Sequence, residues 1–516
     1  MKKVLLSTVA LFSVLTLMAG PVDGKRALIV ANNVVRLHAL KHANVDKQIV
    51  ADDSSVKLQS INFASGMENL ILYNYSMPLN HQGDSLNGFV VLSGDDIATP
   101  ILAFSEDGTL STTTLNPAVR FWLEQYNRQI AAGRDNKSNA TREIERKWTR
   151  LFDGSALSEA LYLWEQKGDL YDDMIPRLLN LHWAQSRPYN NNCPGSAITG
   201  CVATAFGMIM KYWNYPEHGF GQHSYNGANN PAAYPDWPYG ELSADFENTY
   251  YDWNNMPDAL LLNSSSTEIE AVGTLLYHIG VALEMRYGNN ASGCWSLPEY
   301  AIFDTSLHLD PNVNAPYRLR KHFGYKYTYT GMRDSIGDDT LWMQMLYNSL
   351  ADSMPVYYAG WAKDTNEAGH SGTSGHGFLL IGYFSDIVDS NLFYINWGWG
   401  GTADGYFKLD AMKPSGNDFT QWHAAVIGMQ PDTSYHGYNP ADIQPTIQTN
   451  TQVYVQNNNI VAYGLNGQPV TLYDIMGRCI TSRPSHQGDN WSITVQPGIY
   501  IVKIGQQPGQ KVIVLQ

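Results

Sequence analysis

The sequence predicts an α+β protein with a two-lobed central domain, an α+β unit before it and a small β-sandwich after it. Between residues 174 and 431, helical patterns come first and strand patterns follow, which is typical of an α+β domain with a cleft between two lobes. In the preceding unit, apolar strand-like runs come before a helix that starts at Pro117. In the last unit, short alternating strands are separated by Gly, Asn and Pro.

The composition is that of a soluble multidomain protein and argues against a nucleic-acid partner. The chain has 516 residues, which is long for one domain. Hydrophobic residues make up 44% of the chain and charged residues 16%, and the formal net charge is −15. Because the sequence has no basic stripe that could neutralise phosphates, we expect no nucleic acid among the partners.

Residues 1–22 are predicted to be a secretory signal peptide. Two lysines follow Met1, an apolar run extends from Val4 to Met18, and the small residues Ala19 and Gly20 come next. A membrane anchor is the alternative, but the apolar run is short for a bilayer. We therefore expect export through the periplasm, and a protein that is secreted or attached to the outer-membrane surface.

Residues 23–130 are expected to form the first α+β unit. A strand and turn are predicted at Gly88–Asp96, a second strand at Ile101–Ser105, and the helix from Pro117 onwards. Residues 131–173 are rich in charge and predict an exposed connector, where a protease could cut. For Thr141–Leu151 alone, a charged surface helix explains the pattern equally well.

The central domain is assigned to residues 174–431, followed by a linker at 432–450 and the β-sandwich at 451–516. In the central domain, helices are predicted first and strands later, at Cys201–Tyr212, Ile269–Ala282, Thr340–Leu350, Pro355–Gly360, Gly377–Gly382, Leu392–Asn396 and Gly405–Leu409. In the β-sandwich, strands are predicted at Val453–Val455, Ile460–Ala462, Pro469–Tyr473, Trp491–Ile493, Ile499–Ile504 and Gln510–Val514.

Cys201 lies where a mostly buried helix begins, directly after Gly200. Unpaired N–H groups and the helix dipole lower the pKa of a thiol at such a position, so Cys201 is a candidate nucleophile. A buried structural cysteine is the alternative. The other cysteines, Cys193, Cys294 and Cys479, form no metal-ligand spacing, so we expect no metal. A disulfide between Cys193 and Cys201 would silence the nucleophile.

A cysteine nucleophile needs a base, and one glycine-rich loop carries two candidates, His370 and His376. His376 is preferred because it leads directly into an apolar strand, which fixes its backbone. His370 lies deeper in the loop, where imprecise geometry would lower the rate. For either histidine taken alone, a solvated surface residue is the alternative.

Asn396 and Trp397 follow at the end of a strand, in the sequence Asn-Trp-Gly-Trp-Gly-Gly. The amide of Asn396, or an indole packed over the ring, could hold the second imidazole nitrogen in place. A tight turn with aromatic packing is the alternative. Upstream, the side chain of Gln185 and the N–H of Cys201 could form an oxyanion hole, although Gln185 by itself is an ordinary exposed polar residue.

The order Gln, Cys, His, Asn resembles that of papain-type cysteine peptidases, and the chain is most similar to the streptopain family, the peptidase C10 group. The resemblance covers about residues 176–431. It is carried by the stretches Gln185–Asn190, Thr199–Ala205, Met210–Pro216, Pro355–Tyr358, Gly375–Phe378, Asn396–Gly401 and Asp404–Phe407.

The flanking units show resemblances of their own. The first unit resembles the inhibitory pro-domain of the same family, in Gly88–Asp96 and Phe121–Leu123. The last unit resembles the C-terminal sorting domain of the type IX secretion system of Bacteroidetes, in Leu472–Arg478, Pro497–Tyr500 and Lys511–Val514.

The resemblance implies a papain-like fold, with Cys201 as the nucleophile and His376 as the acid/base. It also implies that Gly375 contacts the substrate backbone. A second substrate contact would fall near Gly293, where the family's serine is offset by one position, to Ser292.

Substrate preference is expected to come from an apolar pocket. Trp361 and the loop Gly288–Trp295 are its candidate walls. The loop before His376 carries extra residues around Thr365–Gly372, so access to the site and specificity are expected to differ from the family pattern.

These observations predict a secreted cysteine endopeptidase, made as a zymogen, that forms a thioacyl intermediate at Cys201 and needs no cofactor. The expected partners are protein or peptide substrates, the chain's own pro-domain as inhibitor, and the secretion machinery through the last unit. Two alternatives stay open: an acyl-transferase or amidase on the same scaffold, and a catalytically inactive surface binding protein. The retained cysteine and histidine argue against the second.

Overall fold

The computed structural model describes residues 20–516 with internal gaps, and these form two compact units, Met1–Tyr435 and His436–Gln516. The residues outside the description are 1–19, 64–65, 137, 168–173, 231–235, 295–313, 337–338, 363–374, 389, 412–420, 438–451, 457–458, 464, 466–468, 475–478, 484–490, 497, 505–509 and 515–516. The predicted signal peptide lies almost entirely outside the description. Among the described residues, no helix is both long and apolar enough to cross a membrane.

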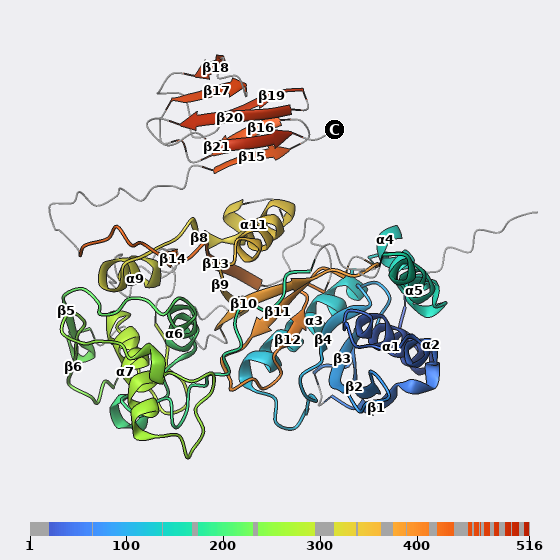
Figure 1. The fold of residues 1–516 in the computed structure, drawn as a ribbon, viewed down its shortest axis with the longest axis horizontal. Coiled ribbons are helices and arrows are strands. Elements are labelled where there is room, and N and C mark those ends of the chain that lie inside the picture. The colour runs from blue at the N-terminus through green and yellow to red at the C-terminus, as the bar shows by residue number, and fades with distance from the viewer. Residues whose placement is uncertain are drawn as a thin grey trace, which may run out of the picture. The chain divides into compact units, whose positions relative to one another are not determined.

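The N-terminal part of the larger unit contains helices and an antiparallel set of strands, as predicted (Figure 1). Its elements are α1 (Gly24–Ala39), α2 (Lys47–Ala51), β1 (Lys57–Ile61), β2 (Leu70–Pro78), β3 (Ser85–Ser93), β4 (Ile101–Ser105), α3 (Pro117–Asp135), α4 (Arg142–Phe152) and α5 (Ser155–Lys167). Asn116 caps α3 by accepting a hydrogen bond from the N–H of Val119, and Pro117 occupies the first turn. No helix was predicted over α1, which begins at the side-chain cap of Asp23.

The expectation of an exposed connector over 131–173 is wrong for most of that range. Residues 142–152 and 155–167 are the helices α4 and α5. Trp148 is 1% exposed, and its Nε1 donates to the carbonyl of Ala98 at 2.8 Å. The charged positions hide an amphipathic pattern, with Ile144, Trp148 and Leu151 on the buried face of α4. Residues 168–173 lie outside the described residues.

In the central part of the larger unit, most helices precede the strands, as predicted, although four short strands lie among the helices. Its elements are α6 (Cys201–Trp213), β5 (Gln222–Asn226), β6 (Glu241–Asp245), α7 (Ser266–Ala282), α9 (Ala315–Phe323), β7 (Tyr325–Lys326), β8 (Tyr329–Met332), α10 (Arg333–Ile336), α11 (Asp339–Ala351), β9 (Val356–Ala362), β10 (His376–Phe384), β11 (Leu392–Asn396), β12 (Gly405–Phe407), β13 (Gln421–Ile427) and β14 (Gln430–Pro431). The larger unit extends to Tyr435, whose hydroxyl donates to the carbonyl of Lys321 at 3.0 Å.

Ten strands from both parts form one antiparallel sheet, in the order β1-β2-β3-β4-β12-β11-β10-β9-β13-β8 (Figure 1). The parts meet where β4 pairs with β12, with Phe104 opposite Tyr406 and Ala103 opposite Phe407. The sequence predicted two separate units here. The structure joins them because the edge of one strand set pairs with the edge of the other and satisfies backbone groups that an open edge would expose.

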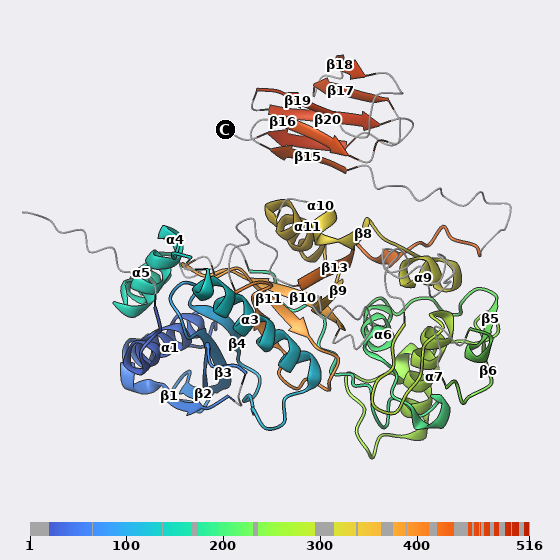
Figure 2. The same cartoon turned by 180° about the vertical axis from the view of Figure 1, so that it is seen from behind.

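The two faces of this sheet pack against different helices. On β10, Leu379 and Ile381 belong to the apolar core that includes residues of α1, α6 and α7. Phe378 and Leu380, which point the other way, belong to the core that includes residues of α3 and α11. Figure 2 shows α3 running across the sheet. Both faces are therefore covered, which explains the continuous apolar run in β10.

The C-terminal unit is all-β, and the predicted strands are confirmed there. It contains β15 (Gln452–Gln456), β16 (Asn459–Tyr463), β17 (Val470–Asp474), β18 (Cys479–Arg483), β19 (Trp491–Thr494), β20 (Gly498–Ile504) and β21 (Gln510–Val514). Three strands form one sheet and four form another, and β18 is the strand that was not predicted. Residues of both sheets, among them Ile460, Leu472 and Val502, share one apolar core. This arrangement is a small β-sandwich.

Candidate active site

Cys201 is the first residue of α6, as the sequence predicted. Gly200 precedes it with φ of 86°, a backbone conformation that favours glycine. A Cβ added to Gly200 would lie 3.0 Å from the side chain of Met285 and 3.1 Å from the carbonyl oxygen of Ser292. The close approach of these groups fixes the turn that presents the thiol. The N-cap residue is Gly200, so no N-cap side chain accepts from the first N–H groups of α6.

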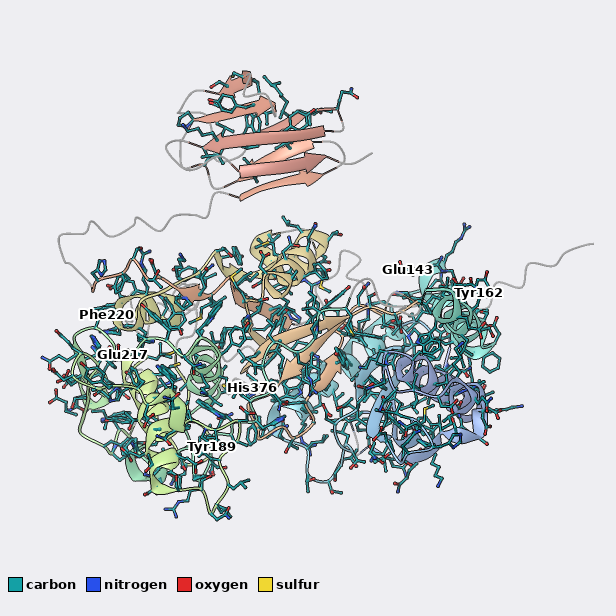
Figure 3. All side chains as sticks on the ribbon, viewed as in Figure 1. Glu143, Tyr162, Tyr189, Glu217, Phe220 and His376 are labelled. Atoms are coloured by element: carbon teal, nitrogen blue, oxygen red, sulfur yellow. The ribbon has the colours of Figure 1, made fainter. Side chains whose placement is uncertain are left out.

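His376 is the first residue of β10, and its neighbour Gly377 reaches the thiol. The N–H of Gly377 donates to Sγ of Cys201 at 3.4 Å. Nε2 of His376 lies 3.0 Å from the carbonyl oxygen of Trp397. Because a carbonyl accepts and cannot donate, Nε2 carries the proton, and Nδ1 is the nitrogen left for Cys201. Figure 3 shows His376 between the helices α6 and α7 and the strands of the sheet.

The electrostatics of the pair favour its charged form. Burial alone would raise the pKa of the Cys201 thiol, but the charge of His376 and hydrogen bonds from His376, Gly377 and Val202 outweigh burial and hold that pKa below its ordinary value. Burial would likewise lower the pKa of His376, but the Cys201 thiolate and the carbonyl of Trp397 raise it above its ordinary value. The two shifts have opposite signs, as a thiolate–imidazolium pair requires.

The side chain of Asn396 forms no hydrogen bond with His376 among those of the described residues, which corrects the expectation that its amide holds the second ring nitrogen. Its Nδ2 donates to the carbonyl of Leu181 at 2.6 Å, and its Oδ1 accepts from the N–H of Gly398 at 3.0 Å. The indole of Trp397 is tilted, with its centroid 6.5 Å from that of His376. The ring nitrogen is therefore held by a backbone carbonyl. Side-chain chemistry in the sequence does not reveal such a partner.

Gln185 is 5% exposed, so the alternative of an ordinary exposed residue is wrong. The N–H of Thr199 donates to its carbonyl at 3.0 Å, which ties its backbone two residues from Cys201. Its Nε2 is buried and has no hydrogen-bond partner among the described residues. A buried donor without an acceptor is costly, so this amide is available for an acceptor that arrives with a ligand.

Ser292 and Gly293, expected to contact substrate, bind other parts of the chain. The hydroxyl of Ser292 donates to the carbonyl of Ile198 at 2.7 Å and accepts from the N–H of Gly288 at 3.0 Å. Gly293 exchanges backbone hydrogen bonds with Arg286, at 2.8 and 3.2 Å. The loop is thus fastened beside the turn before Cys201, and the Ser292 hydroxyl is engaged with backbone groups.

The remaining predicted residues are described in part. Gly375 lies directly before β10 and is half-buried. Trp361 lies in β9, opposite Trp422 of β13, and nothing is described of its side chain. His370 and the extra residues at 365–372 lie outside the described residues, as does Trp295.

All four cysteines are free, so no bridge joins Cys193 to Cys201. Burial raises the pKa of Cys193 to about 12, and that of Cys294 is raised by burial and by the nearby Cys201 thiolate. The pKa values of both thiols are therefore raised, whereas that of Cys201 is lowered. The described residues contain no group of three or more His, Cys, Asp or Glu that could hold a metal ion.

Comparisons with known proteins match two parts of the chain. Residues 183–407 match the model of the Peptidase C10 family, and residues 19–130 match the model of the Spi protease inhibitor. The first match contains Gln185, Cys201 and His376. The second ends within α3.

Three relatives illustrate the extent of the similarity. Streptopain of Streptococcus pyogenes is 27% identical over 387 residues, which are 73% of this chain and 85% of streptopain. The thiol protease/hemagglutinin PrtT of Porphyromonas gingivalis is 26% identical over 430 residues, 80% of this chain and 42% of PrtT. The solved structure of active wild-type interpain A cysteine protease from Prevotella intermedia is 32% identical and covers 49% of this chain and 95% of its own, with a TM-score of 0.39.

Proposed function

The chain belongs to the Peptidase C10 family and is a cysteine peptidase, and from this premise we propose that it is a secreted endopeptidase made as a zymogen. In this proposal Cys201 is the nucleophile and His376 is the acid/base. The observation that carries it is the geometry at the start of β10, where the N–H of Gly377 donates to Sγ of Cys201 at 3.4 Å and Nε2 of His376 lies 3.0 Å from the Trp397 carbonyl oxygen. The lowered pKa of Cys201 and the raised pKa of His376 agree with this geometry.

The reaction begins with transfer of the Cys201 proton to Nδ1 of His376. The thiolate attacks the carbonyl carbon of a peptide bond and forms a tetrahedral intermediate with a negative oxygen. His376 then gives its proton to the leaving amine, the C–N bond breaks, and a thioacyl enzyme remains. Water, deprotonated by His376, releases the acid product and restores the thiol. No cofactor takes part in these steps.

We assign the oxyanion hole to Nε2 of Gln185 and the backbone N–H of Cys201. The Gln185 amide is buried without a partner among the described residues, and the Cys201 N–H opens a helix whose N-terminus has no side-chain cap. Both are donors held in place before the reaction starts, so they stabilise charge that develops in the transition state.

We assign Asn396 an indirect role in orienting His376. Its Oδ1 accepts from the N–H of Gly398, and the carbonyl of Trp397 in that same peptide unit accepts from His376. Polarising one end of a peptide group strengthens hydrogen bonding at the other end. Asn396 thus orients the Trp397 carbonyl, which in turn orients the imidazole of His376.

The inhibitor of the zymogen is proposed to be the chain's own residues 23–130. This segment largely coincides with the match to the Spi protease inhibitor. Its strand β4 pairs with β12, and the ring of Trp122 lies 5.4 Å from that of Phe378 and 5.9 Å from that of Trp397. The contacts reach the residues that flank His376, so removing the segment would change the surroundings of the site.

Export and processing complete the proposal. We infer that residues 1–22 direct export and that the β-sandwich engages a type IX secretion machinery, which leaves the protein secreted or attached to the outer-membrane surface. The sequence features of the N-terminus and the β-sandwich of the second unit support this. We infer that cleavage between the inhibitory segment and the peptidase domain frees the enzyme.

Digestion of casein under reducing conditions tests the proposed function. The full-length protein and its self-processed product are incubated with casein, with and without iodoacetamide pretreatment. We expect cleavage at internal peptide bonds that iodoacetamide and Cys201→Ala abolish, while Cys479→Ala, which removes an exposed thiol of the second unit, leaves it intact. Failure of the wild type to cleave would overturn the assignment of an active peptidase. Acyl transfer to an added amine in place of hydrolysis would favour the transferase.

A further inference from the structure

Trp397, whose carbonyl faces His376, is also held through the N–H on its other side. That N–H donates to Oδ1 of Asp404 at 3.0 Å, and the indole Nε1 donates to the carbonyl of Ala403 at 3.1 Å. Asn396 binds the N–H of the next peptide unit, at Gly398. Asp404 and Asn396 therefore fasten the peptide units before and after the Trp397 α-carbon, which together set the direction of its carbonyl.

The side chain of Asp404 is buried where it makes this contact. It is 1% exposed, and its Oδ2 has no hydrogen-bond partner among the described residues. Nδ1 of His182 lies 3.9 Å from Oδ2 and is itself buried without a hydrogen-bond partner in the described chain. A Cβ on Gly401 would come within 2.6 Å of that Nδ1, so the imidazole rests against the turn that carries Trp397.

Three other titratable groups near Asp404 come from separate segments of the chain. Asp107 follows β4, Tyr394 lies in β11, and Arg177 precedes α6 and binds both. Burial raises the pKa of Asp404, and the contacts with His182 and the N–H of Trp397 oppose that rise. A buried carboxylate is costly to keep. This carboxylate accepts from the N–H of the residue whose carbonyl faces His376, which indicates more than turn closure.

We propose that Asp404 is a positioning residue for the reaction, which accepts the Trp397 N–H and so aims the Trp397 carbonyl at Nε2 of His376. This inference rests on the proposed function, in which His376 is the acid/base. Without the Asp404 acceptor, the Trp397 peptide can rotate and the 3.0 Å contact with His376 lengthens. The imidazolium then loses its fixed acceptor, and the thiolate–imidazolium pair forms less readily.

The test compares Asp404→Ala and Asp404→Ser, which remove the carboxylate, with Asp404→Asn, which keeps an oxygen for the Trp397 N–H and places an amide toward Nδ1 of His182. The control is Asp386→Asn, because Asp386 is also buried and also accepts backbone N–H groups, from Val388 and Ser390. For each full-length variant, thermal unfolding, casein kinetics after processing, and the pH dependence of Cys201 alkylation by iodoacetamide are measured. Peptide mapping identifies the alkylated thiol.

We expect Asp404→Ala and Asp404→Ser to lower kcat by roughly 10- to 100-fold with little change in KM, and to move the alkylation midpoint of Cys201 upward. Asp404→Asn should keep the wild-type alkylation midpoint. Asp386→Asn should lower the unfolding temperature and leave the alkylation midpoint unchanged. The proposal would be overturned if folded Asp404→Ala and Asp404→Ser kept the wild-type alkylation midpoint. It would also be overturned if Asp404→Asn lost as much kcat as Asp404→Ala. If wild-type Cys201 shows no enhanced reactivity, the proposed function fails first, and independently of Asp404.

Discussion

The N–H of Gly377 donates to Sγ of Cys201 at 3.4 Å, so the residue directly after His376 binds the thiol itself. The strand that carries the imidazole thus also carries a donor for the thiolate. Because both groups belong to the start of β10, their positions relative to α6 are fixed together. Any change that displaces this strand is expected to affect thiolate stability and proton transfer at once.

Gly377→Ala is predicted to reduce activity strongly. A Cβ at this position would lie 2.5 Å from the hydroxyl of Tyr357, so either that side chain or the start of β10 must move. We expect slower Cys201 alkylation and lower kcat in casein assays. Gly273→Ala is the matched control, because its Cβ would meet Asn192 at 3.4 Å, an ordinary contact on helix α7. That variant should keep full activity and gain up to about 1 kcal/mol of stability. Equal activities of the two variants would contradict the role of Gly377.

Gln185→Ala is predicted to lower kcat by about 10²- to 10³-fold while alkylation of Cys201 stays at the wild-type rate. Alkylation generates no oxyanion, whereas peptide hydrolysis does, so the two measurements separate transition-state stabilisation from thiol reactivity. Loss of both activities together would instead indicate that Gln185 supports the fold around Cys201.

Trp122→Ala is predicted to loosen the hold of the N-terminal segment on the central domain. The ring approaches Gly360 so closely that a Cβ there would lie 2.9 Å away, and its Nε1 donates to the carbonyl of Lys408 at 3.1 Å. Truncating a buried tryptophan costs about 3–5 kcal/mol. We expect the full-length chain to process itself faster than the wild type at the same protein concentration. Gel electrophoresis measures the rate. A processing rate equal to that of the wild type would show that this contact does not restrain the zymogen.

A low pH is predicted to destabilise the N-terminal segment because Glu106 becomes protonated. Burial alone would raise the pKa of Glu106, but Lys41 and His42 outweigh burial and lower it from 4.5 to about 2. Since the folded pKa lies below the unfolded one, the stabilisation is complete above about pH 4.5 and is lost as the pH falls toward 2. The shift corresponds to a contribution on the order of 3 kcal/mol.

The contribution of Glu106 is measured as the difference between wild type and Glu106→Gln in chemical denaturation at several pH values. We expect the difference to be largest near pH 6 and to shrink between pH 4.5 and 2. The ammonium of Lys41 lies 2.8 Å from Glu106 and 4.8 Å from the ring of Tyr406, so the pair also links the segment to β12. A difference that stays constant across this range would exclude the ion pair as its source.

Much of the fold was predictable because its local signals agree with its tertiary structure. Cys201 opens a helix after a glycine with positive φ, and the apolar run after His376 is a strand buried on both faces. The connector at 131–173 was mistaken for an exposed segment, since dense charge on one face of α4 hid the spacing of Trp148 and Leu151. The pairing of β4 with β12 joins residues about 300 positions apart, and no local pattern encodes it.

The candidate site was predictable where side chains carry its chemistry and not where the backbone does. Residue order made Gln185, Cys201 and His376 the candidates. Backbone carbonyl and N–H groups occur all along the chain. The sequence therefore gives no sign that the carbonyl of Trp397 and the N–H of Gly377 belong to the site. Asp404 lies within a stretch that carries the family resemblance, but its contact with Trp397 depends on the turn between β11 and β12.

The pH dependence of Cys201 alkylation in wild type and His376→Ala tests whether Cys201 and His376 form a thiolate–imidazolium pair. Full-length protein is treated with iodoacetamide from pH 4 to 10, and the rate at Cys201 is followed by peptide mapping. We predict that the alkylation midpoint of wild-type Cys201 lies at a pH below the ordinary thiol pKa of about 8.5, and that His376→Ala moves this midpoint up to that value. His370→Ala should leave the wild-type profile unchanged. A wild-type midpoint near that of an ordinary thiol, or one that His376→Ala does not move, would contradict the thiolate–imidazolium pair.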